Sequence, residues 1–404
     1  MLASDQWWTT CRVVGMAALV ALAAAACGGG SADSEAVAST VASTVASTAS
    51  STVASTAASR ATTIAPVTTE APVTTEAPVT TSVAAPSGAS ASAALAPSSG
   101  CGTAGAVGPG EELRTMASGG VRREYVRHVP PAHDGTTPVP LIVDFHGYSE
   151  GAAIHVKMSG LGTYGDEQGF VTVTPQGLGD VPRWDTSLGS SDLAFVGDLL
   201  DELEATLCID RARIYVTGLS NGAFMTSAIA CAYADRVAAV APIAGVRTID
   251  GCAPARPVPM LAFHGTADGF VPFDGGLGEQ ALDLPAPDGS GRTLGELGLD
   301  LSEAVGGPTV PEIVAAWAAR NGCEEATTET LVAEDVALVR HACPLGAEVG
   351  LYRIEGGGHA WPGSEFSALV ESIVGRTTFS IDANELMWEF FQDHALTVLD
   401  PVGG

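Results

Sequence analysis

Residues 212–230 read ARIYVTGLSNGAFMTSAIA, and this stretch places Ser220 between two elements of secondary structure. The apolar run before Ser220 is typical of a buried strand, and the run after it is typical of a helix. Gly218 and Gly222 complete the pattern G-x-S-x-G. Strand, sharp turn and helix are the surroundings that a nucleophile elbow requires. The stretch therefore predicts that Ser220 stands at the end of a sheet with its hydroxyl exposed.

The chain is strongly acidic, with 404 residues, a formal net charge of −28 and Lys157 as its lysine. A surface of this charge repels nucleic acid and anionic membranes. Neither is therefore an expected partner, and membrane contact is expected only through an N-terminal lipid anchor.

The N-terminus predicts export. The apolar run over residues 13–26 is too short to span a bilayer. It ends in AAACG, which resembles a bacterial lipobox, although Ala24 stands where leucine is usual. We predict a signal peptide over residues 1–27 with Cys27 as the lipidated first residue, and secretion without a lipid is the alternative. Either route gives an extracellular protein.

Residues 28–100 are a low-complexity linker rich in Ala, Ser, Thr and Pro, with Val-Ala-Ser-Thr and Ala-Pro-Val-Thr-Thr-Glu repeats. Such sequence lacks the large apolar side chains that offset the entropy cost of ordering a chain. It is expected to act as a disordered tether, and residues 101–404 are expected to form the folded domain.

Short apolar runs alternate with helical patterns along the folded domain. Strands are expected at residues 125–129, 139–145, 170–175, 212–217, 238–243, 260–264 and 351–355. Helices are expected at residues 192–207, 223–230 and 382–394, with Asp192 and Asp382 as N-caps. This alternation predicts an α/β fold with a mostly parallel central sheet flanked by helices. Asp144 interrupts the otherwise apolar second strand.

Six cysteines fall in the folded domain, and an even number in an exported domain suggests disulfides. Proximity in the sequence favours the pairs Cys323–Cys343, Cys231–Cys252 and Cys101–Cys208. Neither C-x-x-C nor H-E-x-x-H occurs in the chain. No metal and no cofactor is therefore expected.

A serine nucleophile needs a base to take its proton and a carboxylate to hold that base. In this kind of fold the partners follow in the order Ser, Asp, His, each after a strand. Asp268 follows the strand at 260–264, with Asp274 as the nearest competitor. His359 follows three glycines after the strand at 351–355. These residues predict a catalytic triad of Ser220, Asp268 and His359.

An oxyanion hole needs two N–H groups aimed at the developing charge. Asn221, directly after the nucleophile, supplies one of them. The loop after the strand at 139–145 is expected to supply the other from Tyr148, with Ser149 as the alternative.

Four ordered motifs carry a resemblance to a known family. They are His-Gly at residues 146–147, Gly-Leu-Ser-Asn-Gly at 218–222, His-Gly-Thr-x-Asp-x-x-Val-Pro at 264–272 and Gly-Gly-Gly-His-x-Trp-Pro-Gly at 356–363. Over residues 101–396 the chain resembles the secreted polyhydroxybutyrate depolymerase/feruloyl esterase family, within carbohydrate esterase family 1. The resemblance implies an α/β-hydrolase fold and a metal-independent serine esterase that acts on polyhydroxybutyrate-type oligoesters or on feruloyl and acetyl esters of plant polysaccharides. It also implies the triad Ser220, Asp268 and His359.

Two departures from the family pattern bear on the substrate. Tyr148 stands where many members have Cys, and Asp185 follows Trp184 where Asn is common. Trp184, Trp361 and Tyr148 are expected either to wall the acyl group or to pack in the core. Residues 275–308 form either a small lid or an inert surface insertion.

Three other functions stay open on the sequence. An acyltransferase with a sugar acceptor and a peptidase use the same triad. A non-enzymatic wall-associated lipoprotein would keep the fold alone, but it is expected to lack a triad member.

Overall fold

The computed structural model describes residues 95–102, 107–298 and 307–396. The predicted signal peptide, the lipidation site Cys27 and most of the predicted linker lie outside the described residues. Ser98 is buried, and its hydroxyl donates a hydrogen bond to the carbonyl oxygen of Leu207 at 2.6 Å. The folded part therefore begins before residue 101, the predicted boundary, because Ser98 already packs against it.

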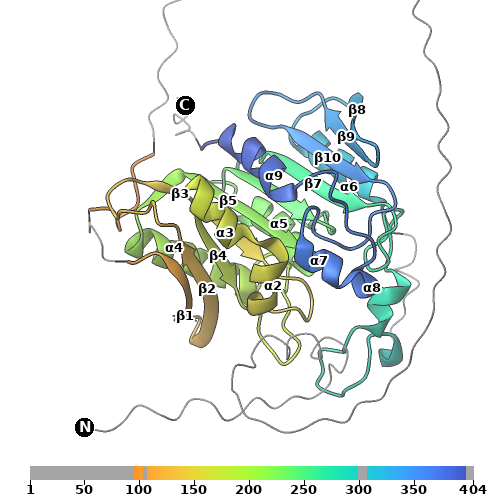
Figure 1. Ribbon diagram of the computed structural model, residues 1–404, viewed down its shortest axis with the longest axis horizontal. Helices are drawn as coiled ribbons and strands as arrows, with labels where there is room; N and C mark the ends of the chain where they lie inside the picture. Colours follow the sequence, from red (N-terminus) through yellow and green to blue (C-terminus); the bar gives the residue numbers. More distant parts are fainter. Residues whose placement is uncertain (1–94, 103–106, 299–306, 397–404) are drawn as a thin grey trace, which may run out of the picture. The chain divides into compact units, whose positions relative to one another are not determined.

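The core of the domain is a ten-stranded sheet in the order β1-β2-β4-β3-β5-β6-β7-β10-β9-β8 (Figure 1). The strands are β1 (Gly110–Ser118), β2 (Val121–Val129), β3 (Val139–Phe145), β4 (Val171–Pro175), β5 (Ile209–Leu219), β6 (Ala239–Ile243), β7 (Met260–Gly265), β8 (Thr327–Ala333), β9 (Val336–His341) and β10 (Val349–Ile354).

The middle of the sheet is parallel and its two edges are antiparallel. β4, β3, β5, β6, β7 and β10 pair in parallel along the centre. β1 and β2 form a hairpin on one edge, and β8 and β9 form a hairpin on the other. β3, β4, β6 and β7 are buried along their whole length, as expected of parallel strands covered on both faces. This is the α/β-hydrolase arrangement, and the predicted fold class is confirmed.

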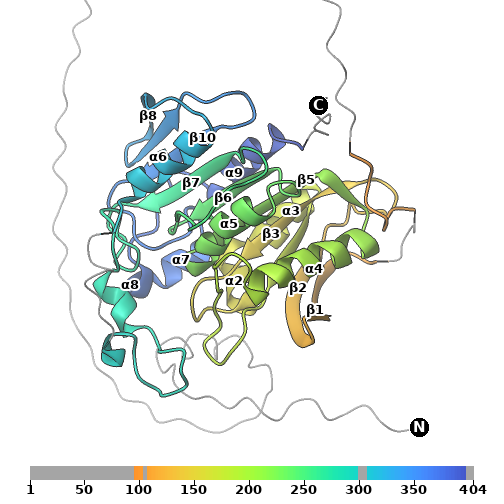
Figure 2. The ribbon, with the colours of Figure 1, turned by 180° about the vertical axis from the view of Figure 1, so that it is seen from behind.

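Helices cover both faces of the sheet. α3 and α9 lie on the face seen in Figure 1, and α4, α5 and α6 lie on the face seen in Figure 2. The helices are α2 (Ala152–Ser159), α3 (Leu161–Gln168), α4 (Ser191–Thr206), α5 (Asn221–Ala232), α6 (Val310–Arg320), α7 (Glu365–Leu369), α8 (Glu371–Val374) and α9 (Ala383–Gln392), with the 3-10 helices η2 (Glu279–Asp283) and η3 (Gly295–Leu297).

Two helix starts test the predicted caps. Asp382 caps α9 by accepting the backbone N–H groups of Asn384 and Glu385, as predicted. The prediction for α4 is wrong, because Ser190 is its N-cap. Asp192 lies inside the first turn, where it is buried against Arg123 in a 2.8 Å ion pair.

The structure contains the three disulfides that sequence proximity favoured, namely Cys101–Cys208, Cys231–Cys252 and Cys323–Cys343. Their closed loops differ in length, since the first joins residues 107 apart and the third joins residues 20 apart. In the described part of the chain, no helix combines the length and apolar character needed to cross a bilayer.

Candidate active site

Ser220 occupies the sharp turn between β5 and α5. Its backbone φ of 58° is left-handed, an unfavourable conformation for a residue with a side chain. The turn leaves no room for side chains on the flanking glycines. A β carbon on Gly222 would collide with the carbonyl oxygen of Phe145, and one on Gly218 would approach the same oxygen to 2.6 Å. The structure therefore gives Ser220 the elbow that the sequence predicted.

Asp268 and His359 meet at the same edge of the sheet. β5, β7 and β10 are parallel, so the loops that follow their carboxyl ends share one edge. His359 Nδ1 lies 2.7 Å from Asp268 Oδ2, and both side chains are buried. The other carboxylate oxygen accepts the N–H groups of Phe270 and Val271, each at 2.9 Å. The bond to Nδ1 leaves Nε2 of His359 as the nitrogen that can take up a proton.

The surroundings of Asp268 favour its ionised form. Burial alone would raise the pKa of the Asp268 carboxyl, but the positive field of His359 and the hydrogen bonds from His359 and Val271 outweigh burial and lower it. Asp274, the competing carboxylate on the same loop, is exposed. His264 is buried, and its Nε2 lies 2.8 Å from the carbonyl oxygen of Val271. The geometry thus selects Asp268 as the partner of His359.

The loop that follows β3, residues 146–149, is the candidate oxyanion loop, and most of its backbone is already engaged. Gly147 N–H donates to Glu150 Oε2 at 2.6 Å, and Ser149 N–H donates to the carbonyl oxygen of Pro182 at 2.8 Å. No described residue accepts a hydrogen bond from Tyr148 N–H. Of the two sequence candidates, the structure therefore favours Tyr148 over Ser149.

Asn221 is the first residue of α5, where helix N–H groups have no partner within the helix. The positive end of the helix dipole favours negative charge there. The Asn221 side chain binds the backbone of Trp184. Its Oδ1 accepts Trp184 N–H at 2.7 Å, and its Nδ2 donates to the Trp184 carbonyl oxygen at 3.2 Å. The Asn221 side chain thus fixes the neighbouring loop while the backbone N–H stays available.

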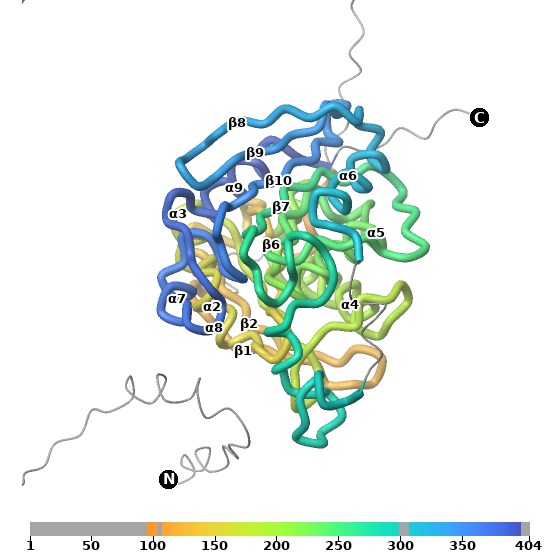
Figure 3. Tube along the Cα trace, turned by 90° about the vertical axis from the view of Figure 1, so that its right-hand side faces the viewer, coloured from red at the N-terminus to blue at the C-terminus, as the bar shows by residue number. Residues whose placement is uncertain are grey.

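A cavity of about 710 Å³, the Ser220 cavity, opens beside the nucleophile. Phe270 lines it, and the Phe270 ring lies 4.9 Å from the His359 imidazole, centre to centre. The insertion between β7 and α6 lies at the bottom of Figure 3, and its described residues supply part of the cavity lining. Residues of the lining include Tyr148, Ser220, Asn221, Phe224, Arg247, Asp250, Leu277, Ala281, Leu284 and Leu294.

Comparison with known proteins places the chain among esterases. Feruloyl esterase B of Piromyces equi is 27% identical over 249 residues, which cover 59% of this chain and 42% of that protein. Probable feruloyl esterase C of Aspergillus terreus is 31% identical over 223 residues, which cover 50% of this chain and 77% of that protein. The chain belongs to the feruloyl esterase family. This is a family of carboxylic ester hydrolases, and the chain spans less than half the length of its Piromyces member.

Two further comparisons of this feruloyl esterase family member concern solved structures and family models. The solved acetyl xylan esterase from Aspergillus awamori aligns with a TM-score of 0.47 and 14% identity, covering 70% of this chain and 99% of that one. No family model matches the chain.

The two tryptophans predicted to wall the substrate do not line the Ser220 cavity. Trp184 is buried, and its indole N–H donates to the carbonyl oxygen of His146 at 2.9 Å. Trp361 is also buried, and its indole N–H donates to Asn384 at 3.0 Å. Both indoles pack inside the domain of this feruloyl esterase family member. Of the two expectations for these tryptophans, core packing therefore describes them and a substrate wall does not. Of the three predicted wall residues, Tyr148 alone is part of the lining.

Sequence reasoning missed a group of charged residues beneath the oxyanion loop, Asp144, Glu150 and His155. One signal was available, because Asp144 lies in an otherwise apolar strand. A buried carboxylate without a partner is costly, so such a residue predicts a buried partner.

Proposed function

We propose that the chain is an extracellular serine esterase that hydrolyses carboxylic esters through an acyl-enzyme on Ser220. The 2.7 Å contact between Asp268 and His359, at the sheet edge where Ser220 turns into α5, is the observation that carries this proposal. Membership of the feruloyl esterase family supports the same reaction class.

In the proposed reaction, Nε2 of His359 takes the Ser220 proton as Oγ attacks the ester carbonyl carbon. The negative charge that develops on the carbonyl oxygen is held by the N–H groups of Tyr148 and Asn221. The C–O bond then breaks, and the alcohol leaves with the proton from His359. A water molecule repeats the sequence on the acyl-enzyme and releases the carboxylic acid. Asp268 stays ionised throughout and stabilises the imidazolium.

The proposed substrates are feruloyl or acetyl esters of plant polysaccharides. The names of the relatives support this choice, because they include feruloyl esterases and a bifunctional acetylxylan esterase/xylanase. The Ser220 cavity also suits a neutral acyl group. Its described lining carries one cation and one anion, Arg247 and Asp250, among otherwise uncharged side chains.

We also propose that the protein works outside the cytoplasm, with Cys27 as its lipid anchor. The three disulfides support an oxidising compartment, where such bonds persist. The lipid anchor has its support in the sequence around Cys27 alone.

The first test is Ser220→Ala. The variant is expected to lose hydrolysis of short p-nitrophenyl esters and to keep its near-ultraviolet circular dichroism and melting temperature, because the hydroxyl is needed for chemistry and not for the fold. Ser190→Ala is the matched control. It removes the cap of α4, at a cost of about 1 kcal/mol, and is expected to retain activity. Undiminished turnover by Ser220→Ala would refute the proposal.

A substrate panel separates the remaining possibilities. It compares methyl ferulate, acetylated xylan, hydroxybutyrate oligomers and a peptide, each with and without a sugar acceptor. Release of ferulate or acetate into water supports the proposal. Preference for hydroxybutyrate oligomers makes the enzyme a polyester depolymerase, transfer to the sugar makes it an acyltransferase, and cleavage of the peptide alone makes it a peptidase.

A further inference from the structure

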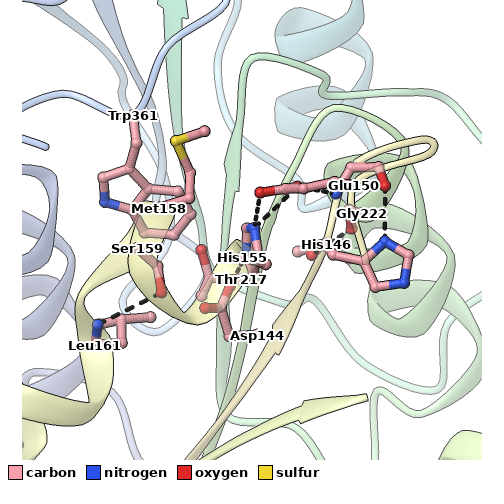
Figure 4. A network of polar contacts seen from close by, with 12 residues as sticks. Asp144, His146, Glu150, His155, Met158, Ser159, Leu161, Thr217, Gly222 and Trp361 are labelled. Carbon is pink, nitrogen blue, oxygen red and sulfur yellow. Dashed lines mark hydrogen bonds and ion pairs between the residues drawn. The ribbon is translucent and has the colours of Figure 1, made fainter. Parts of the chain in front are cut away.

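A buried chain of charged side chains lies next to the oxyanion loop. Nε2 of His155 is 2.7 Å from Oδ1 of Asp144, and Nδ1 of His155 is 3.1 Å from both carboxylate oxygens of Glu150. Figure 4 shows these three side chains pointing toward one another. Asp144 and His155 are completely buried, and the Glu150 side chain is 12% exposed.

The two carboxylates fix the charge of His155. A neutral imidazole carries a proton on one nitrogen, so its other nitrogen would face a carboxylate oxygen as acceptor against acceptor. Both nitrogens of His155 face carboxylates, so both carry protons. Burial opposes this charge, but the fields of Asp144 and Glu150 outweigh it and raise the pKa of His155 to about 10.

Glu150 joins this chain to the backbone of the oxyanion loop. Its Oε2, which faces His155, also accepts the N–H of Gly147 at 2.6 Å. A hydrogen bond to an ionised acceptor is roughly twice as strong as one between neutral groups. The loop is thereby tied through α2 to Asp144 on β3, an element of the central sheet.

Further contacts involve His146 of the same loop and His155 of the charged chain. Nδ1 of His146 lies 2.7 Å from the carbonyl oxygen of Gly147, while its Nε2 accepts Gly177 N–H at 2.8 Å. Trp361, two residues after His359, packs edge-on against His155 with 5.7 Å between ring centres. The charged chain therefore contacts both the oxyanion loop and the segment that carries the proposed base.

We propose that Asp144, His155 and Glu150 are positioning residues, which hold the oxyanion loop so that Tyr148 N–H remains free to meet the developing negative charge. By occupying Gly147 N–H, Glu150 determines which loop donor is left for the substrate. This proposal rests on the proposed esterase function. Among the described residues, no His, Cys, Asp or Glu cluster has the arrangement of a metal site, so the group is assigned a positioning role.

The test uses a pair of substrates that differ in one atom. p-Nitrophenyl acetate places an oxygen in the oxyanion hole, and its thiono analogue places a sulfur there, which accepts hydrogen bonds poorly. The substrate ratio is kcat/KM for the oxygen ester divided by kcat/KM for the thiono ester. Because both values come from the same folded enzyme, the ratio reports the oxyanion hole separately from folding. Titration with a fluorophosphonate corrects each preparation for its fraction of reactive enzyme.

Glu150→Ala and His155→Gln are expected to lower kcat/KM for the oxygen ester by about a hundredfold, the typical cost of a lost oxyanion donor. The thiono ester should lose much less, so the ratio should fall about tenfold or more. Glu150→Gln keeps an acceptor for Gly147 N–H and should recover part of the ratio. It also preserves side-chain size, and so keeps the test available if Glu150→Ala does not fold.

His394→Gln is the matched control, because it breaks another contact between a buried histidine and a carboxylate, 2.8 Å from His394 Nε2 to Oε2 of the partly exposed Glu348, outside the site. It should lower the melting temperature and leave the substrate ratio unchanged. A ratio within twofold of wild type in Glu150→Ala and His155→Gln would overturn the proposal. If the wild-type enzyme hydrolysed neither ester, the proposed function itself would fail, a result distinct from an unchanged ratio.

Discussion

One carboxylate, Asp268, determines which nitrogen of His359 carries a proton. Asp268→Asn replaces an acceptor with an amide that can donate to Nδ1 and so favours the wrong tautomer. If the proposed triad operates, we expect kcat for p-nitrophenyl acetate to fall by about 10⁴-fold, the typical effect of this change in a Ser-His-Asp triad, with the fold retained. The measurement is steady-state kinetics together with a thermal melt.

Asp274→Asn is the matched control for this change. Asp274 lies on the same loop but is exposed, so its amide should leave kcat within twofold of wild type. Equal losses in the two variants would contradict the assignment of Asp268.

His155 should make the free energy of unfolding fall as the pH becomes alkaline. Its pKa is raised from 6.5 to about 10 by Asp144 and Glu150, so the folded state keeps a proton that the unfolded chain releases. This contribution is complete below pH 6.5 and is lost as the pH rises to about 10. We expect urea unfolding from pH 6 to pH 10 to show the wild type losing stability relative to His155→Gln, by up to about tenfold in the equilibrium constant per pH unit. Parallel curves for the two proteins would contradict the imidazolium assignment.

The sequence indicates the proposed triad more readily than it indicates the residues that surround it. Ser220, Asp268 and His359 each follow a recognisable strand and stand in motifs. His155 stands in no motif and precedes Ser220 in the chain, and sequence position does not reveal burial between two carboxylates. Trp361 lies two residues after His359 in the sequence, and Trp184 lies far from the proposed triad, but both indoles turn inward to hydrogen-bond partners, which no local pattern indicates.

At the scale of elements, α6 begins with a complete capping box. The Thr309 side chain accepts the N–H of Glu312, and the Glu312 carboxylate accepts the N–H of Thr309. We expect Thr309→Ala to cost about 1 kcal/mol in the free energy of unfolding, measured by urea denaturation. Because Val310 and Ile313 of this helix line the Ser220 cavity, KM should rise while kcat changes little. A loss of kcat at constant KM would contradict this view of α6 as a wall.

Several helices and strands were not predicted from the sequence, and most of these omissions have a physical reason. β8 is exposed along nearly its whole length, so it lacks the alternation of apolar and polar residues that marks a half-buried strand. α2 and α3 are short and meet at Gly160, which interrupts any helical periodicity. α6 did carry a signal, since Thr309 and Glu312 stand three residues apart, as a capping box requires.

For the molecule as a whole, the net charge of −28 should favour neutral substrates over anionic ones. A field of this sign slows the approach of anionic substrates, and salt screens it, with a Debye length of about 10 Å at 0.1 M. We expect kcat/KM for p-nitrophenyl succinate, an anion, to rise several-fold between about 0.01 M and about 0.5 M salt. The neutral p-nitrophenyl butyrate should show no such rise, and an equal response of both esters would exclude a field effect.

If the protein is held by its N-terminus, as proposed above, the Cys101–Cys208 disulfide has a mechanical consequence. Ser98 bonds to the backbone of Leu207 and Ile209, and the disulfide lies three residues further on. A force applied along the preceding chain thus enters the domain at the start of β5 and bypasses the β1–β2 hairpin. The strand that bears the load is the strand that ends at Ser220. Pulling on the chain from the N-terminal side of Ser98 would therefore load β5, to whose start the disulfide joins the chain covalently, while the β1–β2 hairpin stays unloaded.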